Sequence, residues 1–266
     1  VAEIIGVKQA QKAIVIEVRH PFYSDEIAWI YNERGVAALT QGMVSDALPL
    51  LRQATFIMSH RKTPEADTHA FHAAERRIQL NYAIALLEHG EVRDAQRLFN
   101  ELNAGSIQLP TSTPSEIYPF SELFLAVCDH IGGGFGRAKT KYAHLQDAFA
   151  TNNQFRAVAI TCRCHAAHAR SQQQFDEGLE LAELAIKAAS RSEQRDVEHL
   201  ALVTKARLLI SKEQSTDAIP ILDRALNYSR QMGLVLIEFD AKIAMSTLMT
   251  QQGDYSLAGQ YASEAV

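Results

Sequence analysis

The residues best suited to bind a metal lie close together in one segment of the chain. Cys162, Cys164, His165 and His168 all carry side chains that bind zinc. On a helix, Cys164 and His168 share one face while Cys162 and His165 share another, and no second pair of ligands is evident elsewhere. Four ligands must converge on a zinc ion, so the pattern favours small and half-buried side chains packed where helices cross.

Two other segments invite a catalytic interpretation. His69, His72 and Glu75 follow one another at three-residue steps, but the zinc-protease spacing of two histidines four residues apart is absent. The glycine-rich run 132–136 resembles a phosphate cradle, yet it lacks the Gly-Lys-Ser/Thr ending and a preceding strand. We interpret the first as a solvated helix face and the second as a turn. The sequence therefore predicts no enzyme, no metal site and no cofactor.

Bulk properties narrow the class of protein. The 266 residues are 47% hydrophobic and 21% charged, with a net charge of −5 and no block of like charges. A nucleic-acid partner is disfavoured because no basic stripe is present. The odd set of Cys128, Cys162 and Cys164 suits a reduced, cytoplasmic protein. No apolar run approaches the roughly 20 residues of a membrane span, so no membrane partner is expected.

A helical pattern recurs along the chain and accounts for most of these residues. Each unit has an apolar helix, a turn, and a small residue that opens a second amphipathic helix. The turns centre on Gly42, Gly90, Gly133, Gln173, Glu213 and Gly253. The small residues are Ala47, Ala95, Ala138, Gly178, Ala218 and Ala258, and the last four of them are evenly spaced. A small side chain at that point allows two helices to cross closely.

This pattern resembles the tetratricopeptide repeat (TPR) family over residues 27–266. The first unit matches through Gly35, Gly42, Ala47, Leu51 and Ala54. It departs from the family because Tyr31 replaces the early Trp. The period also differs, since it is about 40 residues here, whereas the usual TPR period is about 34 residues. The resemblance implies an all-α, right-handed solenoid of about six helix pairs.

Segments outside the regular pattern complete the predicted organisation. We expect residues 1–26 to form a helical segment packed on the first repeat, and breaks in the array at 60–68 and 103–119. The second break contains three prolines, Pro110, Pro114 and Pro119, which oppose helix continuation. Because the chain runs from Val1 to a helical pattern at Val266, we interpret it as a fragment of a longer protein.

The resemblance also implies a binding surface. In TPR proteins the first helices of successive units line a concave groove, and the matching positions transfer residue by residue. The predicted contacts are Trp29, Asn32, Leu39, Arg77, Leu80, Ile84, Phe120, Leu123, His130, Arg163, Arg170 and Arg207, with Ile210, Ile243 and Thr247 in the same register. The first half is mostly apolar and the second half carries arginines, which suits a protein or peptide with acidic groups. The carboxylate clamp of chaperone-tail binders is not present, because Val36 and Leu80 interrupt it.

Several functions fit such a domain. The long period is similar to that of sensor regions in signal-transduction ATPases, so we predict the partner-recognition part of a larger regulatory protein. Alternatives are a scaffold subunit of an assembly such as a ubiquitin ligase, an intracellular receptor for a signalling peptide and, more remotely, a metal-dependent enzyme using residues 162–168.

Overall fold

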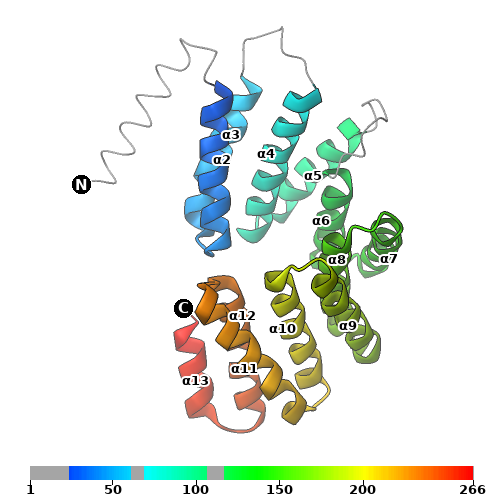
Figure 1. Ribbon diagram of the computed structural model, residues 1–266, viewed down its shortest axis with the longest axis vertical. Coiled ribbons are helices and arrows are strands. Elements are labelled where there is room, and N and C mark those ends of the chain that lie inside the picture. Colours follow the sequence, from blue (N-terminus) through cyan, green and yellow to red (C-terminus); the bar gives the residue numbers. More distant parts are fainter. Residues whose placement is uncertain (1–23, 61–68, 107–116, 266) are drawn as a thin grey trace, which may run out of the picture. The chain divides into compact units, whose positions relative to one another are not determined.

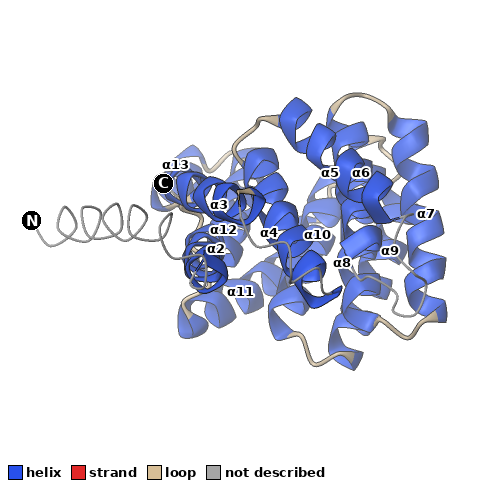
Figure 2. Ribbon diagram, turned by 90° about the horizontal axis from the view of Figure 1, so that it is seen from above, coloured by secondary structure: helices blue, strands red, loops and turns tan. Residues whose placement is uncertain are grey.

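The computed structural model describes residues 24–60, 69–106 and 117–265. This described part contains twelve helices (Figure 1): α2 (Ser24–Thr40), α3 (Val44–Ser59), α4 (His69–Glu88), α5 (Val92–Ser106), α6 (Ile117–Ile131), α7 (Phe135–Thr151), α8 (Phe155–Ser171), α9 (Phe175–Arg191), α10 (Arg195–Ser211), α11 (Ser215–Met232), α12 (Val235–Gln251) and α13 (Tyr255–Glu264). No strand occurs among these residues (Figure 2). The predicted all-α class is confirmed.

The helices form two compact units, which we describe separately. The first unit takes its described residues from 24–39 and 43–121, and the second takes them from 40–42 and 122–265. The division falls inside α6, between Ser121 and Glu122. In the first unit, α2, α3 and α4 share a core built from Ala28, Tyr31, Ala54, Met58 and Ile78. Helix α4 also packs against α5.

The second unit stacks its helices in series. Each helix from α7 to α13 packs against the next one, and α10 additionally contacts α8 and α12. The largest continuous core lies between α10, α11, α12 and α13, where Leu209, Leu222, Met245 and Ala258 are buried together. This serial stacking of antiparallel helix pairs is the solenoid arrangement that the repeats predicted.

The helices of the second unit are evenly spaced along the chain. Helices α7 to α13 begin at positions 135, 155, 175, 195, 215, 235 and 255. A residue with positive φ sits in every turn, at positions 133, 153, 173, 193, 213, 233 and 253. The turns predicted within repeats, such as Gln173, are therefore confirmed. The turns between repeats use the same conformation, so each repeat consists of two helix–turn units of equal length.

Hydrogen bonds at the ends of the helices explain this conformation. After α8, the N–H of Gln174 donates to the carbonyl of Ala169 at 2.9 Å, and the N–H of Gln173 donates to that of Arg170 at 3.0 Å. This is the Schellman arrangement, which satisfies the last carbonyls of a helix when one residue adopts the left-handed conformation. Gln173 adopts it at φ 59° although it is not glycine.

The small residues predicted at helix crossings are buried. Ala47, Ala95, Ala138 and Ala218 are each 0% exposed, and Gly178 is also buried. A Cβ atom on Gly178 would lie 2.5 Å from Cδ2 of Leu208. The backbone of α9 therefore approaches the Leu208 side chain of α10 so closely that a Cβ at this position requires Leu208 to shift.

The predicted breaks and the amino-terminal segment are only partly covered. Residues 1–23, 61–68 and 107–116 lie outside the described residues. Helix α2 begins at Ser24, so the predicted boundary between residues 26 and 27 falls inside this helix. Helices α5 and α6 extend into the predicted break at 103–119. Pro119 fits into the first turn of α6, because the N–H groups there need no partner within the helix.

Candidate functional site

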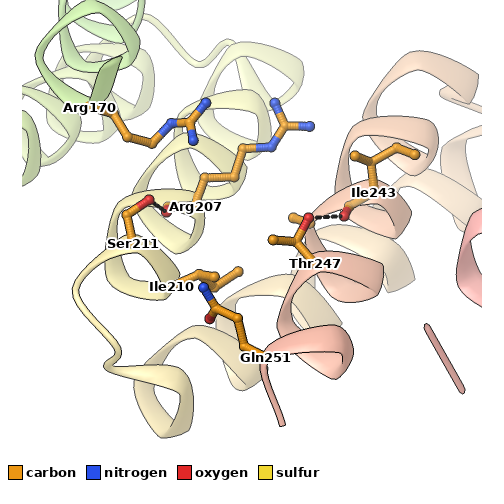
Figure 3. Close-up of a pocket in the computed structure, with 8 residues that line it drawn as sticks. Arg170, Arg207, Ile210, Ser211, Ile243, Thr247 and Gln251 are labelled. Atoms are coloured by element: carbon orange, nitrogen blue, oxygen red, sulfur yellow. Dashed lines mark hydrogen bonds between the residues drawn. The ribbon is translucent and has the colours of Figure 1, made fainter. Parts of the chain in front are cut away.

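One pocket of the second unit gathers residues from three first helices. It has a volume of about 300 Å³ and is lined by Arg170 of α8, by residues of α10 and by residues of α12 (Figure 3). The lining residues beyond Arg170 are Arg207, Ile210, Ser211, Ile243, Ala244, Thr247 and Gln251. A pocket of this size accommodates one side chain or the end of a peptide.

The regular repeat explains why these residues meet. Helices α8, α10 and α12 begin at Phe155, Arg195 and Val235, so each is the first helix of its repeat and starts at the same point of the pattern. Arg207 is equivalent to Thr247, and Arg170 is equivalent to Ile210. Successive first helices therefore present one stripe of positions to the pocket, and the repeats differ there only in side-chain chemistry.

Arg170 is the unusual residue of the pocket. Its side chain is half-buried and has no hydrogen bond or ion pair with any residue of the described chain. Burial, and then the charge of neighbouring Arg207, lowers the pKa of Arg170 below its ordinary value. Figure 3 shows the two guanidinium groups extending side by side from α8 and α10. Positive charge is therefore concentrated at one wall of the pocket without full compensation.

Arg207 is partly neutralised. Its Nη2 donates to Oδ1 of Asp240 at 3.0 Å and to the Asp240 carbonyl at 3.1 Å. The remaining N–H groups of Arg207 make no other hydrogen bond within residues 24–60, 69–106 and 117–265. Arg163 lies two turns before Arg170 on α8, and its Nε is buried without a hydrogen-bond partner in the described part of the chain.

The other polar side chains of the pocket differ in what they can donate. Ser211 Oγ donates to the Arg207 carbonyl at 2.9 Å, and Thr247 Oγ1 donates to the Ile243 carbonyl at 2.9 Å. The Gln251 amide makes no hydrogen bond to the described residues. The donors available to an incoming group are therefore two guanidinium groups and one amide, a set that suits a carboxylate or another oxyanion.

The predicted groove residues lie in different environments in the structure. Arg170 and Arg207 come together in the pocket. Asn32 and Leu123 are only 1% and 0% exposed, and Leu80 is 9% exposed, so these three belong to the core rather than to an open surface. The family pattern alone did not indicate this burial. Asn32 accepts a hydrogen bond from Asn81 at 2.9 Å.

The remaining predicted contacts stay predictions. In the first unit, Arg77 is exposed, and four apolar side chains are half-buried, namely Trp29, Leu39, Ile84 and Phe120. In the second unit, His130 is half-buried and its Nδ1 lies 2.8 Å from Nδ1 of His168. Ser211, Ala244 and Gln251 were not predicted as contacts. Their register would have found them, because Ser211 and Gln251 occupy equivalent places in successive repeats and follow predicted groove positions.

The cysteine and histidine cluster packs in the core of the second unit. Cys162, His165 and His168 are buried, and the ring of Tyr142 stacks on that of His165 with centroids 5.4 Å apart. Gln146 donates to Cys162 Sγ at 3.2 Å. Burial raises the pKa of the Cys162 thiol to about 11 and lowers the pKa of His165 to about 4.

These side chains do not form a metal-binding group. Among the described residues, no three His, Cys, Asp or Glu side chains are placed to hold one metal ion. At neutral pH the Cys162 thiol and the His165 imidazole are therefore neutral and pack in the core at little electrostatic cost.

The glycine-rich segment forms the turn between α6 and α7. Gly133 has φ 79°, and α7 begins two residues later at Phe135. The carboxylate of Asp129, at the end of α6, accepts from Arg137 at 3.1 Å and from Lys141 at 2.7 Å. These ion pairs join α6 to α7. The interpretation of this segment as a turn is confirmed.

Comparisons with known proteins agree on the fold. No protein-family model matches the chain, and no curated protein matches it. The apo form of RapI is similar in structure, with a TM-score of 0.68 and 12% identity over 98% of this chain and 90% of that one. TPR-like repeats of a Podospora anserina putative kinesin light chain give a TM-score of 0.52 and 18% identity, covering 79% and 98% of the two chains.

A third solved structure contains a ligand. A Rap protein complexed with competence and sporulation factor has a TM-score of 0.55 and 15% identity, and the match covers 91% of this chain and 65% of that one. The chain therefore has the TPR-type helical-repeat fold. Within its described residues, no helix combines the length and apolar character that a membrane crossing needs.

Proposed function

We propose that this helical repeat binds a protein or peptide along α8, α10 and α12, and that an acidic group of the partner enters between Arg170 and Arg207. The observation that carries the proposal is Arg170 itself. This half-buried cation has no hydrogen-bond or ion-pair partner among the described residues, and it lies beside a second cation, Arg207. Binding, rather than catalysis, is the role that we assign to the pocket.

Electrostatics gives the reason for an acidic partner. A guanidinium withdrawn from water loses hydration, and a neighbouring like charge raises the cost further. A carboxylate in the pocket would offset both costs, because arginine binds it through two parallel hydrogen bonds. The carboxylate of Asp240, which is partly exposed to solvent, forms an ion pair with Arg207 and not with Arg170. Binding of an acidic group should therefore stabilise the Arg170 guanidinium more than that of Arg207.

The fold of the similar structures supports a peptide ligand in particular. One of them is a Rap protein complexed with competence and sporulation factor, and its fold is comparable to that of this chain. The pocket of about 300 Å³ matches a side chain or a peptide end better than a broad, flat interface. We therefore favour a receptor for a short acidic segment over a scaffold subunit that relies on a large surface.

We further propose that this binding domain is part of a larger regulatory protein. The repeat would sense its partner and transmit the event to an effector, as sensor regions of signal-transduction ATPases do. We place it in the cytoplasm, since an odd number of three cysteines suits a reducing compartment. A partner that binds only after a stimulus would support the sensor, and constitutive association would support the scaffold alternative.

Selection of random displayed peptides on the purified chain tests the proposal. The binding of the best peptide would then be measured by fluorescence anisotropy against the wild type and Arg170→Glu. We expect at least a tenfold weaker affinity for the variant, because a charge-assisted bidentate contact becomes a repulsion. Arg163→Glu and Arg207→Glu should also weaken binding.

The matched control is Lys187→Glu, which makes the same charge change on an exposed residue of α9, the second helix of its repeat. Its affinity should stay within twofold of the wild type. Equal binding by wild type and Arg170→Glu, with unchanged circular dichroism, would contradict the proposed site.

A further inference from the structure

A ridge of side chains on α12 leads away from the arginine pocket. Val235, Phe239, Ile243, Thr247 and Gln251 follow one another at four-residue steps, so they form one continuous ridge on the helix. The last three residues line the pocket. The first two are large apolar residues that remain 50% and 43% exposed. The ridge is therefore apolar at one end and carries the pocket at the other.

Single exposed apolar residues are common on proteins and need no explanation. This ridge differs because its apolar end is continuous with a pocket wall through Ile243, beside a cation without a partner among the described residues. The two features together complement a ligand that has an acidic group and an apolar side chain at a fixed separation.

We infer that the ligand is an extended peptide segment whose acidic side chain enters the Arg170–Arg207 pocket while a large apolar side chain packs on Phe239 and Val235. This inference rests on the proposed function and names the chemistry of the partner. It adds a second recognition point, outside the pocket, that selects among acidic segments.

The geometry of α12 sets the spacing in the ligand. Arg207 Nη2 donates to Oδ1 and to the carbonyl of Asp240, the residue after Phe239, so this guanidinium lies within about one helical turn, ~5 Å, of Phe239 along the axis of α12. An extended peptide advances about 3.3 Å per residue, so it covers this distance in about two residues. Short peptides in water are rarely helical, which favours the extended form. The acidic and apolar residues should therefore be about two positions apart, a spacing that also places both side chains on the same face of the extended segment.

The test compares the peptides that are selected from a random 12-residue display library by three forms of the chain. The wild type should enrich peptides with Asp or Glu two positions from Leu, Ile, Phe, Met or Trp. Phe239→Ser should retain the acidic preference and lose the apolar one. Arg170→Gln should lose the acidic preference.

Affinities of one selected peptide complete the test. We expect Phe239→Ser to weaken binding about tenfold, and Tyr255→Ser to change it less than twofold. Tyr255 is the matched control because it is an aromatic residue, 73% exposed, at the start of α13 and outside the ridge. Circular dichroism of both variants checks that the helices are intact.

The outcomes separate this inference from the proposed function. If Arg170→Glu abolishes binding while Phe239→Ser binds like the wild type, the proposed pocket is supported and the role of the apolar ridge is contradicted. Enrichment of acidic peptides without an apolar residue two positions from the acidic one also overturns the inference. A selection that enriches no peptide contradicts both proposals.

Discussion

At the scale of single residues, Arg170 illustrates the conflict between binding and stability. Its guanidinium loses water contacts and faces Arg207, and no described residue compensates it. A site prepared for a ligand commonly destabilises the free protein, and removing it raises stability. We expect Arg170→Met to increase the free energy of unfolding by about 1 kcal/mol in urea titrations and to abolish peptide binding. Arg207→Met should not stabilise, since it removes the ion pair with Asp240. A destabilised Arg170→Met protein would show that the arginine has a structural role.

His165 is the residue whose titration should matter most for stability at mildly acidic pH. It is 4% exposed, Tyr142 stacks on it, and its Nε2 has no hydrogen-bond partner among the described residues. Burial is the main cause that lowers its pKa to about 4, with smaller opposing effects from Glu177, which raises it, and from His168 and Lys139, which lower it.

The sign of the pH dependence follows from this shift. The unfolded chain takes up a proton near pH 6.5, whereas the folded chain keeps His165 neutral down to about pH 4. Stability is therefore complete above pH 6.5 and falls as the pH decreases. Protonation of His165 in the unfolded chain should lower the free energy of unfolding by about 2 kcal/mol as the pH falls from 6.5 to 5. Urea unfolding across this range should show a shallower pH dependence for His165→Leu, whereas His144→Gln, at an exposed site, should behave like the wild type. Identical slopes for His165→Leu and wild type would contradict the assignment.

At the scale of helices, close packing at the crossing points fixes the repeat. Gly178 occupies the position that Ala138 and Ala218 hold in neighbouring repeats, and its missing Cβ leaves room for Leu208. Alanine favours a helix over glycine by about 1 kcal/mol. The 2.5 Å approach to Leu208 should outweigh that gain, because the Leu208 side chain is 0% exposed and must shift within a packed core to admit the methyl group.

We therefore expect Gly178→Ala to destabilise the chain by about 1 kcal/mol in urea unfolding, against the propensity trend. Combining it with Leu208→Val should restore part of the loss, since the shorter side chain withdraws from the new methyl group. Gly136→Ala provides the control, because a Cβ there meets nothing within 4 Å. A stabilised Gly178→Ala protein would mean that α9 and α10 adjust easily.

The helices also show what the sequence could predict. Turns and crossing points were predictable, since glycine or a small residue marks them at regular spacing. The turns at Asn153 and Glu193 were missed because they lie between repeats, whereas the recurring pattern marked only the turns within repeats; both adopt positive φ. Burial of Leu123 was missed because the family pattern alone did not distinguish groove positions from core positions on a first helix. The pairing of Arg207 with Asp240 depends on the stacking of α10 on α12, which the resemblance gave only approximately.

At the scale of the whole molecule, serial packing limits how far the effect of a ligand extends. Stability in a repeat protein arises largely from contacts between neighbouring repeats. The pocket joins α8, α10 and α12, so opening of any of these helices destroys it. A ligand that binds only the closed form stabilises it by RT ln(1 + [L]/Kd).

Hydrogen exchange should locate this effect in the second unit. At a concentration of a selected peptide 100 times its Kd, amides of α8, α10 and α12 that exchange by opening the pocket should slow about 100-fold. Amides of α2 to α5, in the first unit, should exchange unchanged. Arg170→Glu at the same peptide concentration serves as the control and should show no slowing. Equal protection of both units would contradict a local pocket and would instead indicate that the peptide acts on the chain as a whole.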